Sequence, residues 1–124
     1  MRPTPNFVRR VLLAACAALA FPAVTAGADA WIVAGQQGLV RFIIVPMEQA
    51  RDERAYELQI SSLCAPERTC FLNFYTNSTS APLAVPLPDA IANESTATYR
   101  RSMKNGVQMF TWSCRMKVAG KDCF

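Results

Sequence analysis

Apolar residues in this chain occur in short runs, and the spacing of these runs predicts a small β-sheet. Residues 31–34 and 39–45 are apolar and rich in β-branched side chains. The link between them, Gly-Gln-Gln-Gly at 35–38, predicts a hairpin. Residues 69–76 are dense in aromatic and β-favouring side chains, so they predict a further strand.

A second hairpin is predicted near the carboxyl terminus, where residues 98–103 and 107–116 flank Lys-Asn-Gly at 104–106. An Asn-Gly pair favours a type I′ turn, which requires a positive φ at both central residues. Strand alternation then places four residues on one core-facing side of the second strand: Phe110, Trp112, Cys114 and Met116.

Residues 47–63 predict the main helix, because they are rich in Glu, Gln, Ala and Arg. Pro46 suits the first helical position. The apolar residues at 56, 58 and 60 also alternate as in a strand, but composition and length favour the helix. Three prolines make 81–88 extended, and Asp89 is expected to cap a short helix that ends near residue 95.

These elements predict an α+β fold. A small, mostly antiparallel sheet would be covered on one face by the main helix at 47–63. The chain has 124 residues, which is the size of one domain.

The first 26 residues have the three parts of a secretory signal peptide. A basic start with three arginines is followed by an apolar stretch, then by Pro22 and small residues. Cleavage after Ala26 fits best, and cleavage after Ala28 or Ala30 also fits. The rival interpretations are a retained anchor over residues 11–28 and a lipoprotein with its lipid on Cys16. Cleavage leaves one exported domain, 27–124, with no membrane span, in the periplasm or secreted.

Removal of the signal peptide changes the interpretation of the charge. The whole chain has a net charge of +4 from 13 Lys and Arg and nine Asp and Glu. Three of these arginines lie in 1–26, so the remainder has ten basic against nine acidic residues, a net charge of +1. No nucleic-acid partner is therefore expected. The charge is nevertheless polarised, with −4 over 27–99 and +5 over 100–124.

Four cysteines follow the signal peptide, and an even number in a short exported chain predicts disulfides. Their spacing fits no common zinc site, and the chain has no histidine. Loop entropy favours crossed pairings, whereas the turn-like residues inside each pair favour local ones. The preferred pairs are Cys64 with Cys70 and Cys114 with Cys123.

Absence of histidine excludes Ser-His-Asp and Cys-His catalysis. Paired cysteines leave no thiolate nucleophile, and no cofactor motif is present. Carboxylates are the remaining catalytic groups. Two pairs are spaced to share a helix face, Glu48 with Asp52 and Glu53 with Glu57, and such pairs can hydrolyse glycosides. The interleaved arginines favour a solvated helix face instead.

The leading hypothesis is a small non-enzymatic binding protein of the bacterial cell envelope, of the inhibitor, immunity or accessory-subunit type. A small carboxylate-dependent envelope hydrolase and a purely structural subunit are the alternatives. An acidic protein surface or another anionic envelope component would be its partner. The candidate binding residues are the basic ones on the second hairpin and beyond it: Arg100, Arg101, Lys104, Arg115 and Lys117.

Overall fold

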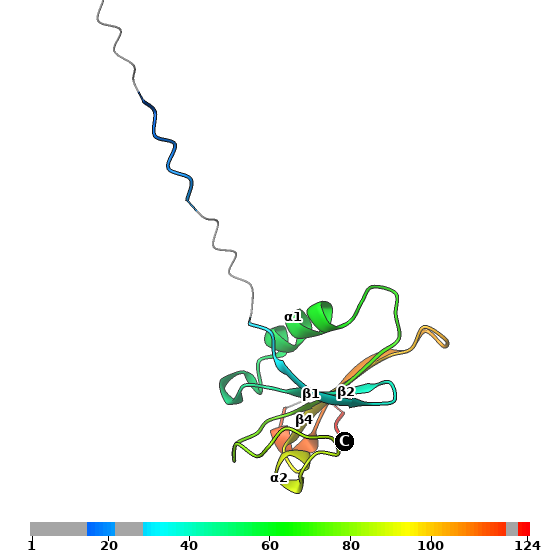
Figure 1. Ribbon diagram of the computed structural model, residues 1–124. Coiled ribbons are helices and arrows are strands. Elements are labelled where there is room, and N and C mark those ends of the chain that lie inside the picture. Colours follow the sequence, from blue (N-terminus) through cyan, green and yellow to red (C-terminus); the bar gives the residue numbers. More distant parts are fainter. Residues whose placement is uncertain (1–14, 22–28, 119–121) are drawn as a thin grey trace, which may run out of the picture.

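The computed structural model describes residues 15–21, 29–118 and 122–124 (Figure 1). Most of the predicted signal peptide, with the cleavage sites after Ala26 and Ala28, therefore lies outside the described residues. Residues 15–21 form neither helix nor strand. Within the described ranges, no helix is both long enough and apolar enough to cross a membrane.

Five strands form one sheet in the order of the sequence. They are β1 (Ile32–Gln37), β2 (Val40–Ile44), β3 (Cys70–Tyr75), β4 (Ser95–Arg101) and β5 (Gln108–Trp112). Neighbouring strands are antiparallel except β2 and β3, which are parallel. A parallel pair needs a crossover connection, and α1 (Glu53–Leu63) supplies it. The predicted α+β class, with a mostly antiparallel sheet and one main helix, is confirmed.

The first hairpin turns later than the glycine spacing suggested. Strand β1 continues through Gln37, and a two-residue turn at Gly38 and Leu39 leads into β2. Gly38 has a φ of +57°, which a hairpin turn requires and glycine adopts without steric cost. The register of β1 against β2 shifts between Val33 and Gly35, which marks a bulge.

Helix α1 begins at Glu53, six residues after the predicted start. Met47–Gln49 is instead a single 3-10 turn. Asp52 has extended backbone angles and caps α1, because its side chain accepts a hydrogen bond from the Ala55 backbone N–H at 3.3 Å. Glu48 and Asp52 therefore do not share a helix face, and this part of the carboxylate hypothesis was wrong.

Tyr56 joins α1 to the sheet. Its ring meets four aromatic rings edge to face at centroid distances of 4.9 to 5.4 Å: those of Trp31, Phe74, Phe110 and Trp112. Its hydroxyl donates to the Ala50 carbonyl at 2.7 Å and lies 2.8 Å from Thr96 Oγ1 in a second hydrogen bond. The core is thus centred on one side chain of the helix.

The other face of the sheet carries the connection between β3 and β4. Figure 1 shows α2 (Asp89–Ala92) and the segment before it on the side opposite α1. Ile91 is fully buried there. Pro88 is the N-cap of α2, with no side-chain cap hydrogen bond, so the predicted capping role of Asp89 was wrong. This connection makes the domain three layers deep.

The second hairpin has a wider loop than the Asn-Gly pair predicted. Residues 102–107 connect β4 to β5, and Ser102 N–H donates to the Val107 carbonyl at 2.8 Å. Gly106 has a φ of +70°, but Asn105 does not have a positive φ, so the type I′ turn was wrong. The Asn105 side chain instead accepts from the Val107 N–H at 3.2 Å and stabilises the longer loop.

The cysteines form the two local pairs. Cys64–Cys70 joins the end of α1 to the start of β3, with a Cα–Cα distance of 5.7 Å. Cys114–Cys123 holds the carboxyl terminus against β5, with a Cα–Cα distance of 4.9 Å. The predicted strand over 107–116 stops at Trp112 because Cys114–Met116 turns as a 3-10 helix. Each disulfide lowers the entropy of the unfolded chain and so stabilises the folded state by about 2.5 kcal/mol.

Substitution of Gly35→Ala is expected to destabilise the domain by about 1–3 kcal/mol through overpacking. A Cβ atom at residue 35 would lie 2.1 Å from Cγ2 of Val85 and 3.2 Å from its Cβ. Val85 is β-branched and stiff, so it cannot rotate away cheaply. Urea unfolding of both single variants and of Gly35→Ala with Val85→Ala measures the coupling. If the double variant recovers nothing, the contact is not the cause.

Substitution of Tyr56→Phe is expected to cost about 1–2 kcal/mol near neutral pH, because it leaves two buried oxygens without their partner. Burial raises the pKa of Tyr56 to about 12, against the opposing effects of Thr96 and Arg115. The raised pKa means that this stability is complete below about pH 10 and is lost as the pH rises towards about 12. The stability gap between the variant and the parent should narrow over that window.

Denaturant unfolding at about pH 8 and about pH 11 measures that gap, with Tyr75→Phe as the control. Within the described part of the chain, the Tyr75 hydroxyl makes a single hydrogen bond, a long one of 3.4 Å from Asn73 Nδ2. Equal losses for the two variants at pH 8, or a gap that widens at pH 11, would contradict the assignment.

Candidate functional site

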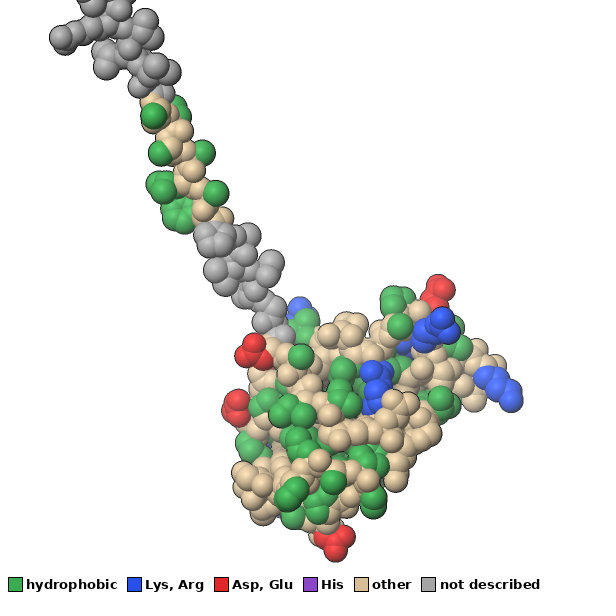
Figure 2. Space-filling model, in the orientation of Figure 1, with side chains coloured by type: hydrophobic (Ala, Val, Ile, Leu, Met, Phe, Trp, Pro, Cys, Tyr) green, Lys and Arg blue, Asp and Glu red, His purple; other side chains and the backbone are tan. Residues whose placement is uncertain are grey.

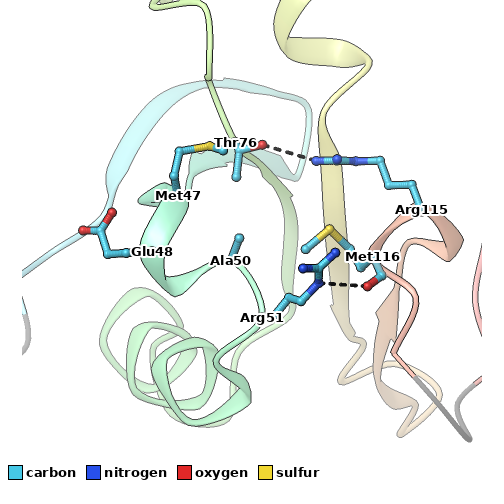
Figure 3. A pocket seen from close by; sticks show the side chains of 7 residues that line it. All are labelled: Met47, Glu48, Ala50, Arg51, Thr76, Arg115 and Met116. Carbon is cyan, nitrogen blue, oxygen red and sulfur yellow. Dashed lines mark hydrogen bonds between the residues drawn. The ribbon is translucent and has the colours of Figure 1, made fainter.

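A hollow of about 290 Å³ lies where the turn at 47–49 approaches the turn at 114–116 (Figure 3). Its lining comes from three separate parts of the chain: Met47, Glu48, Ala50, Arg51, Thr76, Arg115 and Met116. The guanidinium groups of Arg51 and Arg115, which are 64 positions apart in the sequence, thus line the same hollow. The methionines and Ala50 give it an apolar wall.

Arg115 is held firmly in this hollow. Its Nη2 donates to the Glu94 carbonyl at 2.6 Å and to Thr76 Oγ1 at 3.2 Å, and its Nε donates to the Ser95 carbonyl. Such a fixed guanidinium is already oriented before any ligand arrives.

Arg51 is engaged at one nitrogen only within the described residues. Its Nε donates to the Met116 carbonyl at 3.0 Å, which fixes the plane of the guanidinium. Both Nη groups then remain for another acceptor. Figure 3 shows the Arg51 guanidinium beside Met116, below the guanidinium of Arg115 in this view.

The acidic groups near the hollow do not face both arginines. Figure 3 shows the Glu48 carboxylate directed away from the two guanidinium groups. Glu94 is turned to Thr76 and Ser78, from which its carboxylate accepts hydrogen bonds. Burial would raise the pKa of Glu94, but these hydrogen bonds and Arg115 outweigh it and lower that pKa. Among the residues that line the hollow, two arginines stand against one glutamate, so the lining has a net positive charge.

Two more of the predicted binding arginines are used inside the fold. Arg100 donates to Leu72 and Tyr99 carbonyls at 3.0 and 2.9 Å and to Asn73 Oδ1 at 2.7 Å. Burial lowers its pKa. Arg101 donates to two carbonyls of the loop closed by the first disulfide, at 2.6 and 2.8 Å.

The predicted basic residues do not form one site. Arg101 ends β4 and Arg115 binds the carbonyl at its start, so the two lie about 20 Å apart. Lys104 is exposed in the loop of the second hairpin, and Lys117 is exposed next to the hollow. In the view of Figure 2, Lys and Arg side chains gather towards the end where that hairpin projects. Of the predicted set, Arg115 alone lines the hollow, and Lys117 directly follows Met116, another lining residue.

A second hollow region lies between α1 and β5. Two adjoining hollows, of about 270 and 290 Å³, both use Glu53 and Phe110 in their lining. Glu57 lines the first hollow and Asp122 lines the second. The predicted pair Glu53 and Glu57 is thus brought together over an aromatic floor that includes Tyr99 and Phe110.

Arg51 was missed as a site residue. In the sequence it stands among glutamates and other helix formers, a pattern that favours a solvated helix face. Its position comes from the late start of α1, which leaves residue 51 in the turn before the helix. Only Asp52, as a capping residue, could have signalled this turn.

Comparisons of the chain with protein-family models, with curated proteins and with solved structures find no match. The chain is therefore assigned to no family. What supports a function is the geometry of its own residues.

Proposed function

We propose that this chain is an exported, non-enzymatic binding protein of the bacterial cell envelope. The hollow between Arg51 and Arg115 takes an anionic group of its partner, a carboxylate or a phosphate. One observation carries this proposal: two arginines from distant segments converge on one hollow, and both Nη groups of Arg51 lack a hydrogen-bond partner among the described residues.

The chemistry of the hollow suits an oxyanion. A guanidinium presents parallel N–H donors that match two oxygens of a carboxylate or phosphate. Both arginines are anchored through backbone carbonyls, so little side-chain entropy is lost when the anion binds. Exposed Lys117 adds positive charge beside the hollow, which favours the approach of an anion.

Export is supported by the composition of the first 26 residues and by the disulfides. The basic start, apolar stretch and small residues are those of a signal peptide. Two disulfides are compatible with an oxidising compartment. The periplasm or the external medium is such a compartment, and it is where an anionic envelope partner would be met.

Titration with inorganic phosphate and with acetate is expected to shift the NMR signals of the Arg51 and Arg115 side chains. The two titrations distinguish a phosphate from a carboxylate ligand, and sodium chloride at matched ionic strength corrects for screening. Arg51→Gln should weaken binding about tenfold or more, because charge-assisted hydrogen bonds are lost. Arg51→Lys should weaken it less, because the charge remains while the fork is lost.

Arg54→Gln is the matched control, since it removes the same charge three residues away from an exposed position that does not line the hollow. Equal weakening by Arg54→Gln would show that net charge alone attracts the anion. Unchanged signals with both anions would contradict the proposed site.

The mass of the product recovered from a bacterial host tests export. We expect a mass that lacks residues 1–26 and carries no lipid, and a gain of four hydrogens on reduction, two for each disulfide. A full-length mass would show that the first segment is retained. A lipid adduct would contradict simple cleavage, and an unchanged mass on reduction would exclude the disulfides.

A further inference from the structure

Strand β5 has a strand neighbour on one side only within the described residues. In an antiparallel pair, alternate residues of β5 bond to β4. Two hydrogen bonds show which residues these are: Ser113 N–H donates to the Thr96 carbonyl, and Ser102 N–H donates to the Val107 carbonyl. Met109 and Thr111 therefore bond to β4. The N–H and C=O groups of Gln108 and Phe110 point to the open edge.

The chain itself already adds a short strand to this edge. Phe124 N–H donates to the Trp112 carbonyl at 3.2 Å, and Cys123 forms a parallel bridge with Trp112. The second disulfide fixes this segment in place. The edge next to Trp112 is thus occupied, while the part at Gln108 and Phe110 is open within the described residues.

A hollow runs alongside this edge. Four consecutive residues of β5, Met109 to Trp112, line it. A hollow on one face of a strand would be lined by alternate residues, because side chains point to opposite faces in turn. The lining by consecutive residues places the hollow against the edge itself, where an extended backbone would lie.

The helix side of this edge is acidic. Glu53 and Glu57 of α1 line the adjoining hollows, and Asp122 lines the second. Residues four apart on a helix are separated by about 6 Å along its axis. Alternate residues of a strand are separated by about 6.7 Å. Two basic residues in positions i and i+2 of an added strand therefore match the spacing of the two glutamates.

The floor and the opposite face add apolar surface. Phe110 lies on the helix side, where the stem of a lysine or arginine can pack on its ring. Met109 points to the other face and is 54% exposed. An added strand with basic residues towards α1 and apolar residues towards Met109 would complement both faces.

We propose that β5 accepts an extended segment of a partner polypeptide as a sixth strand, and that this segment carries Lys or Arg at alternate positions. This is the recognition mode in which backbone hydrogen bonds give affinity and alternate side chains give specificity. The site is separate from the hollow at Arg51 and does not depend on it.

The acidic lining also decides between this partner and a second copy of the chain. Pairing of two β5 edges would bring Glu53, Glu57 and Asp122 of both copies together, and like charges across an interface oppose association. A basic segment instead neutralises them. The partner is therefore a different polypeptide of opposite charge.

The test uses the full chain, purified under non-reducing conditions, and a capped hexapeptide of sequence Thr-Arg-Val-Arg-Val-Thr. Calorimetry should detect binding that weakens with added salt, and hydrogen exchange should show new protection of the Gln108 and Phe110 amides. Glu53→Gln with Glu57→Gln should weaken binding about tenfold. Glu67→Gln with Asp89→Asn removes two charges from exposed positions that line none of the hollows and should leave peptide binding unchanged.

N-methylated peptides test whether the peptide joins the sheet. In an added strand only alternate residues bond to β5. One set of amides, either those of the arginines or those of the valines, therefore faces β5. Methylation of that set should abolish binding, and methylation of the other set should not. Insensitivity to both would overturn strand addition.

A peptide with glutamate in place of arginine should not bind. Equal binding of that peptide, unchanged binding by the Glu53 and Glu57 variant, or dimerisation of the chain through β5 would each overturn the proposal. Arg51→Gln should leave peptide binding intact, so this result is separable from the anion titration.

Discussion

The fold depends on the buried side chain of Tyr56. Its ring touches four aromatic rings of the sheet and of the segment before β1, and each such pair contributes about 0.5–1.5 kcal/mol beyond burial. Its hydroxyl ties the turn before α1 to β4 through Ala50 and Thr96. A domain of this size has a small core, so a single side chain can fix the helix on the sheet. Helix α1 forms a wall of one hollow region, and the turn before it forms a wall of the other. Tyr56 therefore also fixes the positions of both hollow regions.

Arginines do structural work at the boundaries of the elements. Arg41 donates to the Leu63 carbonyl at 2.7 Å, which satisfies the last residue of α1 and places a positive charge at the negative end of the helix dipole. Arg101 holds the disulfide loop, and Arg115 holds the start of β4. Carbonyl oxygens that would otherwise need water are thereby paired, and the arginines become rigid. These bonds orient the guanidinium of Arg115 before a ligand arrives, and within the described residues Arg51 keeps both of its Nη groups for an anion.

Sequence patterns were informative where the signal is local. The aromatic run at 69–76 became β3, and the turn-like residues inside each cysteine pair favoured the disulfides that form. Patterns failed where a single side chain overrides composition, as when Asp52 starts α1 and leaves Arg51 outside it. They also do not show the hydrogen bonds of the basic residues, because Arg101 and Arg115 bond carbonyls 20 to 36 positions away. Spacing along the chain contains no information on such pairs.

The open edge of β5 poses a problem that its own charges solve. An edge strand exposes backbone groups that can pair with any other edge, and natural proteins protect such edges with charge. Here the charge lies above the edge on α1, at Glu53 and Glu57, and not on the strand itself. Like charges oppose the pairing of two such edges, while no described strand pairs with the backbone groups of Gln108 and Phe110. The same carboxylates that oppose aggregation therefore select a basic guest, so protection and specificity come from one arrangement.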